Sequence, residues 1–201
     1  ELLQNYKDLD FVITPVGGGG LIAGTALAVH FASENCKTLG AEPFEVDDAY
    51  RSLQSGKIET NENANSIADG LKTQLGDLNF PIIQEFVSEI IRVEEQEIIA
   101  ALKLIWERMK IIVEPSSAVA FAAVLREKEK FRGKKVGIII SGGNVDLKNL
   151  PSTYLICYFN DFPDAMEKLE ESKEILKNYS EKIYASHKEV MRIFRKIKYS
   201  S

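Results

Sequence analysis

The stretch that decides the fold runs Phe11-Val12-Ile13-Thr14-Pro15-Val16, then four consecutive glycines from Gly17 to Gly20, then Leu21-Ile22-Ala23-Gly24-Thr25-Ala26-Leu27-Ala28-Val29. The apolar run before the glycines predicts a buried strand, and the run after them predicts a helix. Glycines let backbone N–H groups turn inward, and the helix start adds unpaired N–H donors and about half a positive charge. The stretch therefore predicts a seat for a phosphate or another anion.

Two familiar nucleotide-binding patterns differ from this glycine run. The dinucleotide pattern spaces its glycines as G-x-G-x-x-G and the P-loop ends in Gly-Lys-Ser/Thr, whereas Leu21-Ile22-Ala23 supplies neither. Glycine runs also form ordinary tight turns or close-packing positions, so the run alone leaves that alternative open. A phosphate monoester on a small cofactor fits the flanking residues best.

Composition and charge narrow the class of protein. The 201 residues are 45% hydrophobic and 27% charged, as in an ordinary globular protein, and a net charge of −5 argues against a dedicated nucleic-acid binder. No apolar run approaches the ~20 residues that span a bilayer. The two cysteines, Cys36 and Cys157, and the two histidines, His30 and His187, support neither a disulfide framework nor a zinc site. We expect a cytoplasmic protein that binds neither nucleic acid nor membrane.

Strand-like runs alternate with amphipathic helical patterns along the chain. This rhythm predicts an α/β fold with an open, mostly parallel twisted sheet flanked by helices. We expect strands near 11–16, 38–42, 90–93 and 135–140, and helices near 21–34, 47–56, 80–89, 95–109, 116–129 and 164–197. Residues 1–150 are expected to form a cofactor-binding domain and residues 151–201 a mainly helical extension.

A second glycine turn, Ser141-Gly142-Gly143-Asn144, follows the continuous apolar run 136–140. Ligands of open parallel sheets bind beyond the carboxyl ends of the strands, so this turn and Gly17–Gly20 can face one crevice. Ser141 would then place a neutral hydroxyl beside the ligand. An ordinary turn is the alternative for these four residues taken alone.

Three acidic residues, Glu42, Asp47 and Asp48, lie close together in the sequence. Carboxylates along a loop with an interposed carbonyl suit Mg²⁺ or Ca²⁺. Acidic loops are also common as solvated surface, and the residues alone favour that second interpretation.

Six motifs, in this order, resemble a known family: Pro15–Leu21, Ala41-Glu42-Pro43, Ala68-Asp69-Gly70, Trp106-Glu107-Arg108-Met109-Lys110, Glu114-Pro115-Ser116-Ser117-Ala118 and Ser141–Asp146. They resemble the fold-type II pyridoxal-phosphate enzymes, specifically the serine racemase and serine/threonine dehydratase family, over positions 5 to 150. Cysteine synthases and tryptophan synthase β subunits share that fold and are a weaker match.

The resemblance implies pyridoxal 5′-phosphate as cofactor and a group of residues around it. Gly17, Gly18, Gly19, Gly20 and Leu21 match the phosphate-binding loop, Gly70 the loop on the substrate side, Glu114 an acid near the ring, and Ser141 the partner of the pyridine nitrogen. Glu114 also precedes a helix start, so a capping role is its alternative. The implied reactions are β-elimination from L-serine or L-threonine, giving a 2-oxo acid and ammonia, and racemisation of serine.

The resemblance also implies a cation site and an effector site. Glu42, the carbonyl of Val46, Asp48 and the more distant Asp10 match the family's Mg²⁺ or Ca²⁺ site. Lys110 and Asn144 match two residues that bind ATP at a subunit boundary, so we expect a homodimer.

One expected residue is absent. The family's Schiff-base lysine lies far upstream of the phosphate glycines, and Lys7 is the only lysine before Gly17. The chain also opens without an initiator Met, in what looks like the end of a helix. We therefore expect a partial enzyme that is inactive without an N-terminal half. The competing interpretation is a non-catalytic module that binds an anion or a phosphorylated effector.

Beyond position 150 the resemblance fades. The apolar run 154–159 fits an edge strand or the start of a small regulatory module, but 51 residues are too few for a full module. A column at Leu169, Leu176, Ile183, Val190 and Ile197 repeats every seven residues, while its companion column is mixed and largely polar. This predicts a helix that packs on its own body or, alternatively, in a dimer.

Overall fold

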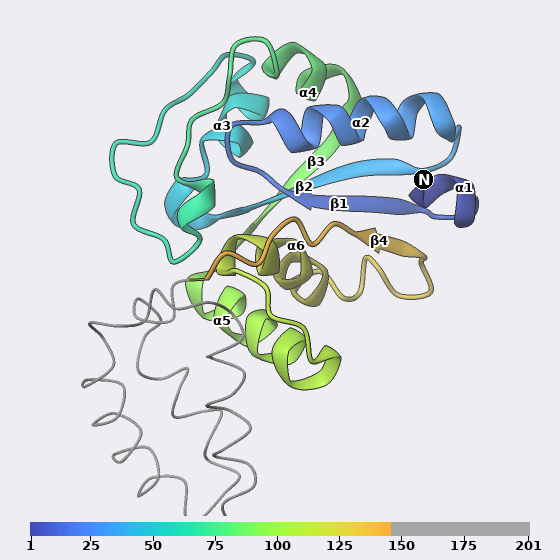
Figure 1. Ribbon diagram of the computed structural model, residues 1–201. Coiled ribbons are helices and arrows are strands. Elements are labelled where there is room, and N and C mark those ends of the chain that lie inside the picture. The colour runs from blue at the N-terminus through green and yellow to red at the C-terminus, as the bar shows by residue number, and fades with distance from the viewer. Residues whose placement is uncertain (146–201) are drawn as a thin grey trace, which may run out of the picture. The chain divides into compact units, whose positions relative to one another are not determined.

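The computed structural model describes residues 1–145 (Figure 1). The chain divides into two units, Glu1–Asp146 and Leu147–Ser201. The strand, the helix and the seven-residue column predicted within 151–201 therefore lie outside the described residues. No helix in the described part is long and apolar enough to cross a membrane.

The described residues form one sheet of four parallel strands. The strands are β1 (Phe11–Pro15), β2 (Lys37–Pro43), β3 (Val87–Val93) and β4 (Val136–Ile138), in the spatial order β3-β2-β1-β4. This confirms the predicted α/β class with a parallel sheet. Because β1 pairs with both β2 and β4, the segments that follow β1 and β4 leave the sheet side by side.

Helices cover both faces of this sheet. They are α1 (Leu2–Asn5), α2 (Gly20–Ala32), α3 (Asp48–Ser55), α4 (Phe80–Phe86), α5 (Glu95–Leu104) and α6 (Pro115–Arg126). Short turns of 3₁₀-helix, η1 (Phe44–Val46) and η2 (Asp69–Leu71), and a π-helical turn η3 (Ile105–Met109) complete the described elements. Figure 1 shows α2 and α4 on one face and α6 on the other, with α5 packed on α6.

Two predicted helices have different ends from those expected. The helix expected over 80–89 ends at Phe86, because Val87 and Ile90 turn their side chains into the core and pair with β2 as strand residues. The helix expected over 95–109 changes to a π-helical turn after Leu104. That turn accompanies a hydrogen bond of 3.0 Å from the Trp106 indole N–H to the Val113 carbonyl.

The core between α2, α4 and the sheet places the glycine run. Val16, Ile22, Ile83 and Ile90 are buried in one cluster with their neighbours on these elements. A Cβ at Gly40 of β2 would lie 2.8 to 2.9 Å from side-chain atoms of Val16, Ile22 and Ile90, so α2 packs directly against the strand backbone. This close packing seats the start of α2 beyond the carboxyl end of β1.

Candidate cofactor site

A cavity of about 200 Å³ lies beyond the carboxyl ends of β1 and β4. Its lining residues are Pro15, Gly17, Gly18, Gly19, Gly20, Leu21, Ile22, Gly70, Leu71, Glu114, Ser116 and Ser141. The structure therefore brings together around one space all eight residues predicted to hold the cofactor. They are Gly17, Gly18, Gly19, Gly20, Leu21, Gly70, Glu114 and Ser141. They come from four separate parts of the sequence.

The glycine loop supplies hydrogen-bond donors to this cavity. Gly19 is the N-cap of α2 in a left-handed conformation, with φ of 85°, and no side chain caps this helix start within the described structure. The first residues of α2, Gly20 to Ile22, line the cavity. Their N–H groups lack partners within the helix, and the dipole of a 13-residue helix adds positive potential there. The loop can therefore bind an anion.

The four glycines differ in how much room the fold leaves for a side chain. A Cβ at Gly17 would lie 2.9 Å from Thr73 Oγ1, and Gly19 combines positive φ with a contact of 2.9 Å to Leu75, so the fold itself requires glycine at both positions. Gly18 has only ordinary contacts, the nearest at 3.6 Å, and a Cβ at Gly20 would meet no described atom within 4 Å. The described part of the protein therefore has room for side chains at Gly18 and Gly20.

Asn79 fixes the orientation of the glycine loop. Its side-chain amide donates to the Gly18 carbonyl at 2.8 Å, and the Gly76 N–H donates to the same oxygen at 3.2 Å. These bonds hold the carbonyl toward the segment 75–79. Sequence reasoning missed Asn79, because it lies 61 positions from Gly18 and stands in a stretch of ordinary turn composition.

The cavity lining also contains Glu114 and Ser141. Glu114 is the N-cap residue of α6, yet its carboxylate makes no capping hydrogen bond in the described structure, so the alternative capping role is wrong. A side chain at position 142 would have to displace this carboxylate, so Glu114 and Gly142 are in close contact. Burial first, and the charge of Asp69 second, raise the pKa of Glu114 above its ordinary value, while the Asn144 backbone N–H opposes them.

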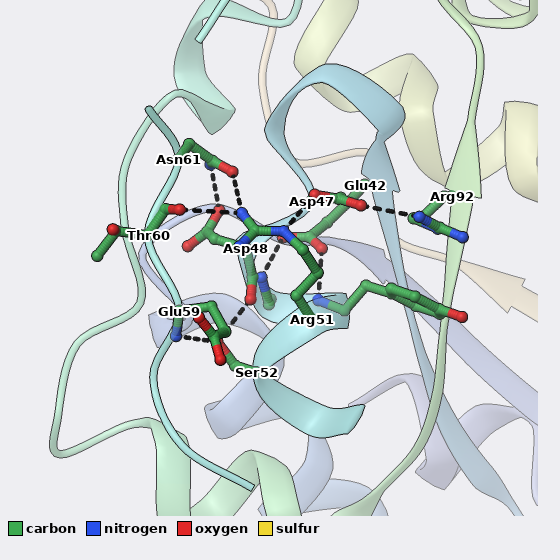
Figure 2. A network of polar contacts seen from close by, with 11 residues as sticks. Glu42, Asp47, Asp48, Arg51, Ser52, Glu59, Thr60, Asn61 and Arg92 are labelled. Carbon is green, nitrogen blue, oxygen red and sulfur yellow. Dashed lines mark hydrogen bonds and ion pairs between the residues drawn. The ribbon is translucent and has the colours of Figure 1, made fainter. Parts of the chain in front are cut away.

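The acidic cluster forms a separate network, shown in Figure 2. Glu42 at the end of β2 is fully buried, and its two oxygens accept the N–H groups of Ala49 at 3.2 Å and Tyr50 at 2.8 Å. Asp48, at the start of α3, is also buried and accepts from the Asn61 side chain at 2.6 Å and from the Leu75 N–H at 3.1 Å. Both side chains thus lie inside the protein, which excludes the solvated-surface interpretation for them.

The nearby arginines neutralise Asp47 alone. Arg51 and Arg92 pair with Asp47 at 2.7 and 2.9 Å, and within residues 1–145 no lysine or arginine forms an ion pair with Glu42 or Asp48 (Figure 2). Burial chiefly, and the charge of Asp48 as well, raise the pKa of Glu42 well above its ordinary value. The described residues contain no group of three or more His, Cys, Asp or Glu side chains arranged for a metal ion. The predicted set contains three carboxylates, those of Glu42, Asp48 and Asp10, besides the Val46 carbonyl, and the described structure does not group the three.

Three other predicted residues belong neither to the cavity lining nor to the acidic network. Asp10 precedes β1, where it accepts from the Lys135 N–H at 2.8 Å, whereas Glu42 lies near the opposite end of the sheet. The structure therefore does not bring Asp10 to the other predicted cation ligands. Lys110 is exposed with φ of 60°, and Asn144 is exposed on the loop after β4. The two residues lie on segments that contact each other, because a Cβ at Gly143, next to Asn144, would lie 2.9 Å from the carbonyl of Ile112, two residues after Lys110.

The fold and the cavity define a class of protein. A parallel α/β sheet with a glycine loop after one strand and a serine loop after its neighbour is suited to binding a phosphorylated cofactor. Residues 1–142 match the family described as pyridoxal-phosphate dependent enzyme, and the chain belongs to this family. The resemblance seen in the motifs is thereby confirmed. Residues 129–200 match a second family, described as a domain of unknown function (DUF5929).

Three relatives illustrate the similarity. Serine racemase of Dictyostelium discoideum is 54% identical over 154 residues, which cover 75% of this chain and 48% of that protein. L-threo-3-hydroxyaspartate ammonia-lyase of Saccharomyces cerevisiae is 46% identical over 149 residues, covering 74% and 46%. The structure of the processed form of threonine deaminase isoform 2 from Solanum lycopersicum superposes with a TM-score of 0.72 at 32% identity, covering 77% of this chain and 43% of that one. The chain thus spans about half the length of the curated relatives it matches.

Proposed function

We propose that this chain is the cofactor-phosphate-binding part of a pyridoxal-phosphate-dependent ammonia-lyase or racemase that acts on a small hydroxy amino acid such as L-serine or L-threonine. Family membership supports the cofactor. The substrate class is supported by relatives named serine racemase, L-threo-3-hydroxyaspartate ammonia-lyase and threonine deaminase. When bound, the cofactor withdraws electrons from the amino acid and so makes its Cα–H acidic.

The residues of this chain have distinct parts in that proposal. The N–H groups of the glycine loop and of the start of α2 bind the phosphate, and Asn79 keeps the loop oriented for it. Ser141, which also lines the cavity, offers a neutral hydroxyl to the ring nitrogen. A neutral partner leaves that nitrogen less protonated than a carboxylate would, which favours loss of a β-hydroxyl.

One observation carries the proposal: the described protein leaves room for a side chain at Gly20, a residue that lines the cavity. Gly20→Ala should therefore preserve the fold while adding a methyl group to a residue that lines the anion seat. We expect affinity for pyridoxal phosphate and for inorganic phosphate to fall about tenfold or more, which corresponds to the loss of roughly one charge-assisted hydrogen bond. The measurement is a titration followed through the emission of Trp106, the single tryptophan.

Gly24→Ala is the matched control, because Gly24 is on the same helix, also has no described atom within 4 Å of its Cβ position, and lies outside the cavity. It should bind both ligands like the parent. If the parent binds neither, or if Gly20→Ala binds both as well as the parent does, the cavity is not the phosphate site and the proposal is wrong.

We also propose that activity requires residues beyond those present here. The lining of the described cavity contains no lysine, and Lys7, which precedes the glycine loop in sequence, is not among the lining residues. A Schiff-base lysine must be placed and desolvated within the site. We therefore expect no turnover of L-serine or L-threonine by this chain alone.

A divalent cation at Glu42 and Asp48 is a further part of the proposal. Both carboxylates are buried, and neither has an arginine or lysine ion-pair partner within residues 1–145. The pKa of Glu42 is also well above its ordinary value. Such a pair suits Mg²⁺ or Ca²⁺. A cation at a hundredfold excess over its Kd would stabilise the fold by about 2.7 kcal/mol. Glu42→Gln and Asp48→Asn should each remove the rise in melting temperature with added cation. An unchanged rise in both variants would exclude this site.

Exposed apolar side chains stand beside Lys110 in the sequence, at Leu104, Met109, Ile111 and Ile112. We propose that this surface contributes to a homodimer in the cytoplasm and that Lys110, with Asn144, binds ATP at its boundary. Sedimentation equilibrium with and without ATP tests this. A monomer that is unaffected by ATP would contradict it.

A further inference from the structure

Two adjacent serines at the start of α6 contact the two loops that form the cavity wall. Ser117 is fully buried, its Oγ accepts the Gly142 N–H at 2.7 Å, and its hydroxyl donates to the Gly142 carbonyl at 2.8 Å. Both backbone groups of one residue are thus held by one side chain. The same carbonyl also accepts the Glu114 N–H at 3.2 Å.

Ser116 makes a single hydrogen bond to the other loop, from the Gly70 N–H, which also donates to Asp69 Oδ1 at 3.0 Å. It is 3% exposed, lines the cavity, and its Oγ accepts the Gly70 N–H at 3.0 Å. A Cβ at Gly70 would lie at that same distance from Oγ, so the two residues are in close packing contact. Gly70 in turn lies against the glycine loop, since its carbonyl is 3.2 Å from the position of a Cβ at Gly17.

These loops have little regular structure of their own. Gly70 stands in the three-residue turn η2, and the described residues 139 to 145 belong to no helix or strand. α6, by contrast, is a helix of 12 residues with eight buried positions between Pro115 and Ala123, so its first turn is rigidly placed against the sheet. A hydroxyl on that turn can therefore fix a loop that would otherwise have several conformations.

We propose that Ser117 is a positioning residue, which sets the Ser141 hydroxyl in the cavity by holding Gly142, and that Ser116 separately sets Gly70. Ser141 itself is exposed and directly precedes the held residue. Its place relative to the glycine loop is thus determined by bonds that neither Ser141 nor the ligand makes. The consequence for cofactor binding rests on the proposed function, while the anchoring of the two loops does not.

Ser117→Ala tests the anchor directly, because it removes both hydrogen bonds and adds no volume. Amide hydrogen exchange on the full chain should become at least about tenfold faster at Gly142, as expected for the loss of about 1.4 kcal/mol of local stability, and stay unchanged at Gly70. Ser116→Ala should give the reverse result. Ser117→Thr keeps the hydroxyl and should restore slow exchange at Gly142.

Ser52→Ala is the matched control. Ser52 is also fully buried, and its hydroxyl also bonds two backbone groups, the Asp48 carbonyl and the Glu59 N–H, away from the cavity lining. It should change exchange at Glu59 and leave Gly142 as in the parent. If Ser117→Ala does not fold, Ser117→Cys takes its place, since a thiol of similar size is a much weaker donor and acceptor.

Ligand binding distinguishes a positioning role of Ser117 from a general effect of this residue on stability. Ser117→Ala should weaken pyridoxal phosphate severalfold and leave inorganic phosphate unchanged, because the glycine loop is intact and only the ring-side contact is displaced. A parent that binds no pyridoxal phosphate would refute the proposed function, and the exchange data would still decide the anchor. Unchanged exchange at Gly142 in Ser117→Ala, or equal acceleration at Gly142 and Gly70, would overturn the inference.

Discussion

Gly40 shows how strongly a single missing side chain shapes this fold. Gly40→Ala would force a methyl group to within 2.9 Å of the buried side chains of Val16, Ile22 and Ile90. Overpacking of this kind costs about 1–3 kcal/mol in the free energy of unfolding. Urea denaturation should therefore show a lower midpoint for Gly40→Ala.

Gly24→Ala supplies the comparison for that measurement. Gly24 lies within α2, its φ is not in the left-handed region, and its Cβ position is open among the described atoms. Alanine there should raise the free energy of unfolding by about 0.4–1 kcal/mol. Equal effects at Gly24 and Gly40 would mean that the close packing of α2 on β2 is incorrect.

The raised pKa of Glu114 predicts a pH dependence with a definite sign. Burial and the Asp69 charge raise this pKa above 4.5, so the folded state holds a proton that the unfolded state releases. The resulting contribution to stability is complete below the unfolded pKa and is lost as the pH rises through the folded pKa. Asp69→Asn should lower the pKa of Glu114 and so narrow the pH range, between the unfolded and folded pKa values, over which this contribution is lost.

The carboxyl resonance of Glu114 in a ¹³C NMR titration measures this pKa directly. Asp77→Asn is a suitable control, because Asp77 is exposed and is not among the groups that shift Glu114. A Glu114 midpoint that stays the same in Asp69→Asn would show that the two carboxylates do not interact across the cavity.

Residues whose role is local could be predicted from the sequence, and those with distant partners could not. Gly17 to Gly20 can be recognised because a strand, a glycine run and a helix are adjacent in the chain. The role of Asn79 depends on the Gly18 carbonyl, 61 positions away, and that of Ser117 on Gly142, 25 positions away. Asn79 lies in no recognised motif, and although Ser117 belongs to one of the six motifs, nothing in its own neighbourhood indicates Gly142 as its partner.

The types of the elements were predicted more successfully than their ends. Apolar runs identified all four described strands, but β3 begins at Val87 instead of 90 and β4 ends at Ile138 instead of 140. The segment 87–90 fits a helical and an extended pattern equally well, and pairing with β2 decides it. The π-helical turn η3 accompanies the hydrogen bond from Trp106 to the Val113 carbonyl, seven residues further along the chain, and the apolar pattern over 95–109 does not indicate it.

Arg92 joins β3 to the turn that carries the acidic cluster. Its guanidinium lies 3.9 Å from the Tyr50 ring centroid and 4.6 Å from that of Phe44, and it pairs with Asp47. Arg92→Lys keeps the charge but loses the planar stacking, and should lower the free energy of unfolding by about 1–2 kcal/mol. Urea denaturation measures this loss.

Arg132→Lys controls for a general effect of replacing arginine. Its pair with Glu129 is highly exposed, with 75% and 68% of the two side chains accessible, so the change should lie within about 0.5 kcal/mol. If Arg92→Lys is as mild, the aromatic stack does not hold η1 and α3 on the sheet.

At the scale of the whole molecule, the chain matches about half of each relative, and the cavity proposed to seat the cofactor lies in that half. Borohydride reduction in the presence of pyridoxal phosphate should therefore label surface lysines of this chain sparsely and in no preferred position, because the described cavity wall includes no lysine. Peptide mapping by mass spectrometry measures the labelling. A single lysine labelled stoichiometrically would contradict the expectation and identify a catalytic amine within the chain.

The pairing of β1 with β4 has a consequence for the synthesis of the protein. Phe11 stands in register with Val136, so the sheet and the cavity beyond it join residues separated by more than half the chain. During translation, the glycine loop leaves the ribosome long before the segment around Ser141, so the cavity that both line is incomplete until that segment has emerged. Such distant pairing also slows folding, because a long loop must close before the contact forms. Completion of the cavity is therefore a late event in the maturation of this polypeptide.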